Sequence, residues 1–331
     1  MSSDRPAVVL IGLGPTAATA LESLAARFDV RAVVRPGPAD EPTIVRATEL
    51  GAEVGSEATI AGIRALIDRV APDAVVVSSF DRILPADLVD SRPFVNVHYA
   101  PLPRYRGRAT VNWAILNGEA EASISVHRLV PGLDAGGILV QESVPIGPTT
   151  TVTELYDALN VIQERVLGDA VARAIAGDPG EQQDEGHASY ACTRVPADGE
   201  IDWSAPTLQS DRLVRALTPP FPGAFTWLGL ERLWIDAAEP SPDPPTWDGR
   251  VPGRVVAVSR DGGWIDVLTG DGVLRVHRVR RDGPDLGSAE ESVPAATVVR
   301  SVRATLGLQI GDLVGRVRLL EDPGADTPAT R

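Results

Sequence analysis

The chain has 331 residues and a formal net charge of −14, and all 31 of its basic residues are arginine. A length of this order suggests two domains, and the acidic balance argues against a nucleic-acid partner, because proteins that bind nucleic acid usually present a basic face. The single cysteine, Cys192, excludes an internal disulfide, and the four histidines show no zinc-ligand spacing with it, so we expect no metal.

The first half of the chain alternates short apolar runs with segments of helical spacing. The predicted strands are 7–11, 30–34, 74–78 and 94–98, and the predicted helices are 17–28, 43–50 and 60–70. Strands that alternate with helices pair in parallel, so the pattern predicts a doubly wound α/β sheet. The Gly12–Ala17 turn is similar to a dinucleotide fingerprint. Its third glycine is replaced by Ala17, however, and a tight strand-to-helix turn is the better interpretation.

The pattern changes in the second half. Two further strands, 123–129 and 138–144, precede a long helix at 152–176 for which Thr153 is the expected N-cap. Beyond a connecting helix at 208–217, five short strands are predicted, at 224–228, 233–237, 254–259, 264–268 and 273–279. Short strands joined by Asp-Gly turns predict a small barrel.

These elements divide the chain into an N-terminal catalytic domain at 1–205, a C-terminal barrel-like domain at 206–310 and a frayed tail at 311–331. No run reaches the roughly 20 apolar residues of a membrane span. We therefore expect a cytoplasmic protein that makes no membrane contact. No oligomeric state follows from the sequence, and a homodimer is kept open.

Two polar side chains, Asn96 and His98, stand at the end of the predicted strand 94–98. Alternation places both on one side of the strand, and ligands of open α/β sheets bind beyond the carboxyl ends of the strands. An amide N–H can donate to a developing oxyanion, and an imidazole can take a proton from an attacking amine. A histidine at the edge of the core that is satisfied by a backbone carbonyl is the structural alternative.

A carboxylate, Asp134, lies in the glycine-rich loop Val130–Gly137. A carboxylate in such a loop is ordinarily a turn former. An amide, an imidazole and a carboxylate are also the groups needed to transfer an acyl group to an amine, so a catalytic role is the competing interpretation.

The ordered stretch 94–141, which contains Asn96, His98 and Asp134, resembles the catalytic core of folate-dependent formyltransferases. That family includes methionyl-tRNA formyltransferase and the sugar N-formyltransferases. The resemblance implies a Rossmann-like formyltransferase domain followed by an open, OB-like barrel. It also implies transfer of a formyl group from N10-formyltetrahydrofolate to a primary amine, with Asn96 stabilising the oxyanion and His98, oriented by Asp134, moving the proton.

Further segments extend the resemblance. The segment that ends in Ile83-Leu84-Pro85 resembles the one that holds the pterin ring of the formyl donor, and the resemblance assigns donor contacts to Phe80, Asp81, Arg82, Ile83, Leu84, Val130 and Leu133. The segment Leu102–Gly107 resembles the acceptor side of the family's cleft and implies substrate contacts for Tyr105, Arg106 and Arg108. A solvated basic loop is the alternative for these arginines. The chain departs from the family at Ala100-Pro101, where Ser-Leu is usual.

Two features favour a small-molecule acceptor, such as a nucleotide-linked amino sugar or a natural-product intermediate. The chain is acidic, and Arg194 stands where the tRNA enzymes commonly carry lysine, so the resemblance there is closer to the sugar-modifying members. Methionyl-tRNA formyltransferase is the first alternative, and a formyltetrahydrofolate hydrolase, which transfers the group to water, is the second.

Overall fold

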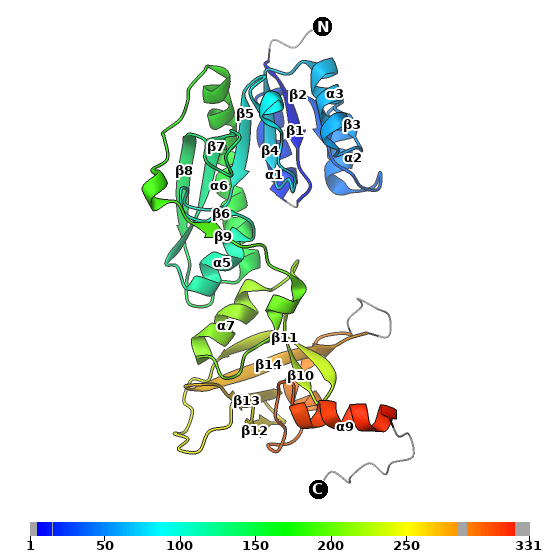
Figure 1. The fold of residues 1–331 in the computed structure, drawn as a ribbon, viewed down its shortest axis with the longest axis vertical. Coiled ribbons are helices and arrows are strands. Elements are labelled where there is room, and N and C mark those ends of the chain that lie inside the picture. Colours follow the sequence, from blue (N-terminus) through cyan, green and yellow to red (C-terminus); the bar gives the residue numbers. More distant parts are fainter. Residues whose placement is uncertain (1–4, 15, 284–289, 322–331) are drawn as a thin grey trace. The chain divides into compact units, whose positions relative to one another are not determined.

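The computed structural model describes residues 5–14, 16–283 and 290–321, and the chain forms two compact units (Figure 1). Unit 1 takes in the chain as far as Ala114, with Glu119–Pro148 and Glu154–Thr193. Unit 2 takes in Ile115–Gly118, Thr149–Thr153 and the chain from Arg194 onward. Among the described residues, no helix combines the length and the apolar composition that crossing a bilayer requires.

Unit 1 is built on a seven-stranded mixed sheet with the strand order β3-β2-β1-β4-β5-β7-β8. Its strands are β1 (Ala7–Ile11), β2 (Asp29–Val34), β3 (Glu53–Gly55), β4 (Ala74–Ser78), β5 (Phe94–His98), β7 (Glu121–Arg128) and β8 (Ile138–Pro145). The first five pair in parallel, whereas β7 and β8 pair antiparallel. Every residue of β1 and β4 is buried, as expected for strands covered on both faces. The predicted α/β class is confirmed.

The helices of this part of the chain are α1 (Thr16–Ala25), α2 (Pro42–Glu49), α3 (Ile60–Val70), α4 (Ala86–Val89), α5 (Thr110–Asn117) and α6 (Val152–Ile175). Two departures from the sequence-based expectation stand out. Helix α5 was not predicted, and α6 begins at Val152, so Thr153 lies in its first turn and is not the N-cap.

The tight turn after β1 brings the backbone close to two neighbours. A Cβ added at Gly12 would lie 2.4 Å from Ala17 Cβ, and one added at Gly14 would lie 2.4 Å from Ser79 Cβ. These glycines therefore serve close packing of the turn against α1 and against the loop after β4, while Pro15 of the predicted turn lies outside the described residues.

Unit 2 is an all-antiparallel β structure with the strand order β10-β11-β14-β13-β12, and β15 pairs with β14. Its elements are α7 (Thr207–Ala216), β10 (Ala224–Leu228), β11 (Glu231–Pro240), β12 (Val255–Ser259), β13 (Trp264–Leu268), β14 (Val273–Arg281), β15 (Val293–Pro294), α8 (Ala295–Val298) and α9 (Ile310–Glu321). One short segment bridges both edges of the sheet, because Leu306 pairs with Leu228 and Thr305 pairs with Arg254. These bridges give the small barrel that the sequence predicts.

Helix α9 occupies about half of the segment for which a frayed tail was expected. Its apolar residues recur at helical spacing, and Ile310, Val314 and Val317 are exposed. The expectation was wrong for residues 311–321, because it was based on Pro323 and Pro328 and did not take account of the helical spacing of the apolar residues before them. Residues 322–331 lie outside the described residues.

Closure of the barrel depends on Gly253, which has a φ of +82° and whose added Cβ would lie 2.2 Å from the carbonyl oxygen of Leu306. We expect Gly253→Ala to lower the free energy of unfolding by about 1–3 kcal/mol, because side chains strain this backbone conformation and the clash opens the bridge. Urea denaturation measures the loss. Gly249→Ala is the matched control, since a Cβ there meets no atom within 4 Å. Equal effects of the two substitutions would contradict this account.

Candidate active site

Strand β5 and its antiparallel neighbour β7 bring the predicted polar residues together. Asn96 pairs in register with His127, and His98 pairs with Ser125. The loop between β7 and β8 returns Asp134 to the same place, where its Oδ2 lies 3.8 Å from His98 Nδ1 and its Oδ1 lies 3.3 Å from Asn96 Nδ2. The structure therefore places the amide, the imidazole and the carboxylate in one cluster.

The hydrogen bonds of His98 indicate which ring nitrogen is basic. Its Nε2 lies 2.8 Å from the carbonyl oxygen of Tyr105, and a carbonyl can only accept, so Nε2 carries the hydrogen. The lone pair of the neutral ring is therefore on Nδ1, on the side of Asp134. Burial lowers the pKa of His98, against the opposing effect of the Asp134 carboxylate. The ring is neutral at pH 7 and can accept a proton.

The Asp134 carboxylate is held on several sides. The backbone N–H of Gly107 donates to Oδ2 over 2.9 Å, and the Asn96 amide donates to Oδ1. Burial acts to raise the pKa of Asp134, but the neighbouring His127 and His98 and the Gly107 N–H together lower it to about 2. The carboxylate is therefore charged throughout the neutral range and can stabilise a protonated His98.

One member of the cluster, His127, was missed in the sequence. The ring is 1 % exposed, and its Nδ1 donates to the carbonyl oxygen of Arg128 over 2.9 Å. Its Nε2 therefore accepts from Asn96 Nδ2, 3.1 Å away. Both amide hydrogens of Asn96 are thus engaged, one by His127 and one by Asp134. The alternation of Ser123, Ser125 and His127 along β7 was the available signal.

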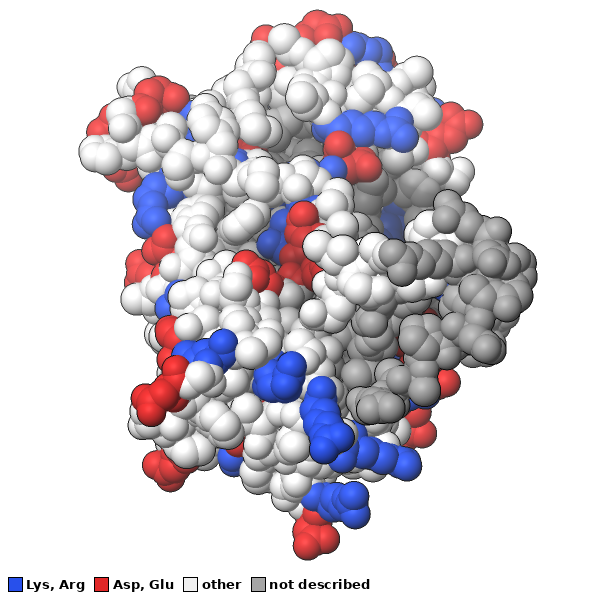
Figure 2. All heavy atoms as spheres, turned by 60° about the horizontal axis from the view of Figure 1, so that its bottom comes forward, with Lys and Arg blue, Asp and Glu red and all other residues white. Residues whose placement is uncertain are grey.

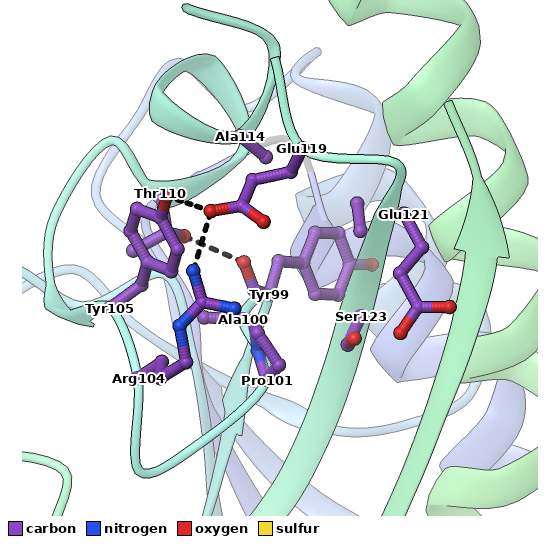
Figure 3. Close-up of a pocket in the computed structure, with 11 residues that line it drawn as sticks. Tyr99, Ala100, Pro101, Arg104, Tyr105, Thr110, Ala114, Glu119, Glu121 and Ser123 are labelled. Atoms are coloured by element: carbon purple, nitrogen blue, oxygen red, sulfur yellow. Dashed lines mark hydrogen bonds and ion pairs between the residues drawn. The ribbon is translucent and has the colours of Figure 1, made fainter. Parts of the chain in front are cut away.

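Tyr105 lines a cavity of about 50 Å³ beside the loop that follows His98 (Figure 3). The tyrosine hydroxyl donates to Glu119 over 2.6 Å, and the guanidinium of Arg104 reaches the same carboxylate oxygen. Ala100, one of the two positions at which the chain departs from the family pattern, also lines this cavity. The contacts fix the loop whose Tyr105 carbonyl holds His98.

The other two predicted substrate residues differ in their surroundings. Arg106 is 2 % exposed, and its guanidinium donates to Gln183 and Glu185. It is therefore engaged within the protein and does not face solvent. The side chain of Arg108 is exposed.

The predicted donor residues lie on two loops, one after β4 and one after β7. Ile83 is 82 % exposed, Leu133 is 52 % exposed and Val130 is 39 % exposed. Leu84 is buried and Phe80 is partly buried in one apolar cluster, which anchors the first loop. Large apolar side chains left in water suit an apolar or aromatic ligand. Within the described ranges, no group of three or more histidine, cysteine, aspartate or glutamate side chains could hold a metal ion.

Comparison with known proteins accounts for both units. The model of the formyl transferase family matches residues 43–171, and that of the formyl transferase C-terminal domain matches residues 195–305. The chain belongs to the formyltransferase family. The methionyl-tRNA formyltransferase of Geobacter metallireducens is 34 % identical to this formyltransferase over 80 % of both chains. That of Geotalea uraniireducens is 35 % identical over 66 % of this chain and 68 % of its own.

Solved structures share the fold of this formyltransferase. HypX from Aquifex aeolicus, in complex with tetrahydrofolic acid, superposes with a TM-score of 0.59 at 17 % identity over 89 % of this chain, which spans about half (47 %) of HypX. A sugar N-formyltransferase from a Shewanella species gives a TM-score of 0.57 at 17 % identity, over 70 % of this chain and 97 % of its own. At these identities the likeness shows the fold alone. The predicted formyltransferase family is confirmed, whereas closeness to the sugar enzymes is not supported.

Proposed function

We propose that this formyltransferase takes the formyl group of N10-formyltetrahydrofolate and transfers it to the amino group of methionyl-tRNA. Two observations support the proposal. For the reaction, His98 presents a free Nδ1 beside a charged Asp134. For the acceptor, the chain is 34 % identical to a methionyl-tRNA formyltransferase over 80 % of both proteins.

The formyl donor, when bound, supplies the activated formyl carbon. We assign its flat ring to the exposed apolar side chains of Ile83, Val130 and Leu133, with Phe80 and Leu84 anchoring the first loop. The exposed Asp81 and Arg82 are available to the polar groups of the donor.

The residues of the cluster then have separate tasks. His98 Nδ1 takes a proton from the attacking amine, and the Asp134 carboxylate stabilises the imidazolium that results. Asn96 exchanges its longer hydrogen bond, the 3.3 Å contact with Asp134, for the formyl oxygen as negative charge develops on that oxygen. The proton held by His98 is finally returned to the departing nitrogen of the donor.

The lowered pKa of His98 has a kinetic consequence. Because the base must be neutral, the acidic limb of kcat/KM that belongs to the enzyme, as distinct from the titration of the acceptor's own amine, should have a midpoint below about pH 6.5, the ordinary histidine value. A pH–rate profile between pH 5 and pH 8 measures the midpoint. A midpoint clearly above that ordinary value would contradict a buried His98 as the base.

A small-molecule amine is the second candidate for the acceptor. The net charge of −14 favours it, since an acidic chain repels a polyanion. Charge is not uniform over the surface, however, and in Figure 2 several arginine side chains gather toward the bottom of the face shown, whereas acidic and basic side chains lie intermixed over the rest of it. The exposed guanidinium of Arg108 could meet an anionic group of either acceptor.

The test is a turnover assay with N10-formyltetrahydrofolate, in which charged initiator tRNA and amino-sugar nucleotides are offered separately and products are read by mass spectrometry. Formylmethionyl-tRNA is the expected product. A formylated sugar nucleotide without formylated tRNA would replace the acceptor proposal by the second candidate. Release of formate with neither acceptor modified would instead indicate a hydrolase.

A further inference from the structure

The buried guanidinium of Arg106 and the side chain of Gln183 form a link between the two loops that carry the catalytic cluster. Gln183, which is 6 % exposed, accepts at Oε1 from Arg106 Nη2 over 2.8 Å and from Arg106 Nε over 3.3 Å. Its Nε2 donates to the carbonyl oxygens of Asp134 and Gly136, both over 2.7 Å. One amide thus joins the arginine after His98 to the backbone of the Asp134 loop.

The link closes into a ring of contacts around Asp134. The residue after Arg106 is Gly107, whose N–H donates to Asp134 Oδ2 over 2.9 Å. The Asp134 carboxylate is therefore held by the Gly107 N–H. The backbone carbonyl of Asp134 is held by Gln183, which Arg106 holds in turn. Moving any member of the ring changes where the carboxylate points.

The loop needs such support because its backbone is strained. Asp134 has a φ of +48°, a conformation that costs about 1–3 kcal/mol for a residue other than glycine and persists only when the surroundings impose it. The segment with Gln183 packs directly on the loop, since a Cβ at Gly137 would lie 2.1 Å from the carbonyl oxygen of Pro179. Backbone hydrogen bonds in both directions between Ile138 and Glu181 fix this contact.

The same segment also fixes the loop after His98. Strand β6 (Arg106–Gly107) pairs in parallel with β9 (Tyr190–Ala191), and Arg106 N–H donates to the carbonyl oxygen of Ser189 over 2.8 Å. The segment between Pro179 and Ala191 thus contacts both the loop after His98 and the loop that carries Asp134, and fixes their positions relative to each other.

We propose that Gln183 and Arg106 are positioning residues that hold the Asp134 carboxylate beside His98, and that Arg106 has this role in place of a substrate contact. The inference rests on the proposed roles of His98 and Asp134. It predicts that loss of the two Gln183 N–H donors lowers kcat while the protein stays folded.

Gln183→Glu is the sharpest variant, because it keeps the shape and the acceptors for Arg106 and removes only the donors to Asp134 and Gly136. We expect kcat to fall by about 10–100-fold, since misplacement of a catalytic group by 1 Å can cost about 10²-fold. KM for the formyl donor should stay within about threefold, because the donor loops are untouched. Thermal unfolding followed by circular dichroism checks the fold.

A double variant with unchanged net charge separates the loss of positioning from the effect of adding a carboxylate beside Arg106. In Gln183→Glu/Glu185→Gln, Arg106 again faces one carboxylate and one amide, but the donors to the Asp134 loop are still missing. The proposal expects the double variant to keep the defect and Glu185→Gln alone to stay near wild type, because Glu185 is largely exposed.

Recovery of kcat in the double variant, or unchanged kcat in Gln183→Glu, would overturn the inference. If Gln183→Glu and the double variant both unfold, Arg106→Lys gives the second measurement, because lysine keeps the positive charge and cannot make the bidentate contact. A folded Arg106→Lys enzyme with wild-type kcat would equally overturn it. Wild-type turnover is measured in parallel. If the proposed function were wrong, wild type and every variant would fail to transfer the formyl group, which distinguishes that case from the outcomes above.

Discussion

His98→Ala should lower kcat for formyl transfer by about 10²–10⁴-fold, the usual contribution of a positioned general base. The imidazole is the group of the cluster that has a free lone pair and a neutral state at pH 7, since its Nε2–H is bound to the Tyr105 carbonyl and burial lowers its pKa. Binding of the formyl donor should change much less, because the apolar side chains assigned to the donor lie on other loops. Steady-state kinetics with each acceptor measures both quantities.

A matched control is available in the same unit. His187 is exposed and bonds to Asp184 at the surface, so His187→Ala should leave kcat within about twofold and unfolding free energy within about 0.5 kcal/mol of wild type. Thermal unfolding of His98→Ala should show a folded protein. If folded His98→Ala kept wild-type kcat, another group would have to take the proton, and the proposed mechanism would be wrong.

The parts of the fold that could be predicted from the sequence are those set by local pattern. The apolar runs of β1 and β4 predict buried parallel strands, and the structure has them at the predicted residues. Strand β3 was missed because it has three residues, of which Glu53 is exposed, and such a short segment has no period to recognise. The antiparallel pairing of β7 with β5 follows from tertiary packing, and the residue pattern of neither strand predicts it.

In the candidate site too, some features follow from the local sequence and others from tertiary packing. That Asn96, His98 and Asp134 lie together could be predicted because they belong to one ordered stretch that resembles the family, and their catalytic roles stay a prediction. Arg106 was assigned to substrate from its position in that stretch, whereas its partners Gln183 and Glu185 are 77 and 79 residues away along the chain. A sequence pattern does not show that an arginine is buried, and burial is what decides whether its charge meets a ligand or another part of the protein.

The second large effect is expected at Asp134. Asp134→Asn is the informative substitution, because asparagine tolerates the positive φ at this position and can still accept from the Gly107 N–H, so that only the charge is lost. We expect kcat to fall by about 10²–10⁴-fold, since removing an orienting carboxylate leaves the imidazolium unsupported. Asp184→Asn, at the exposed pair with His187, is the control and should leave kcat near wild type.

The acidic limb of the pH–rate profile of this variant should shift in a direction that a general loss of structure would not produce. The Asp134 charge raises the pKa of His98, so removing the charge should move the acidic limb of kcat/KM to lower pH. The stability of the fold should respond to the Asp134 charge at lower pH. The pKa of Asp134 is lowered to about 2 in the folded state, so its carboxylate stabilises the fold above the unfolded value of about 3.9, and this contribution is lost as pH falls through about 2.

The difference in unfolding free energy between wild type and Asp134→Asn should therefore persist down to about pH 4 and narrow as the pH falls from there through about 2, as measured by urea denaturation. An acidic limb that moved upward would show that the charge of Asp134 does not raise the pKa of His98, and a stability difference that failed to narrow below about pH 4 would show that folding does not lower the pKa of Asp134. The acidic limb of the rate profile tests the 3.8 Å separation between Asp134 Oδ2 and His98 Nδ1, whereas the stability difference tests all the groups that hold the carboxylate charged, namely His127, His98 and the Gly107 N–H.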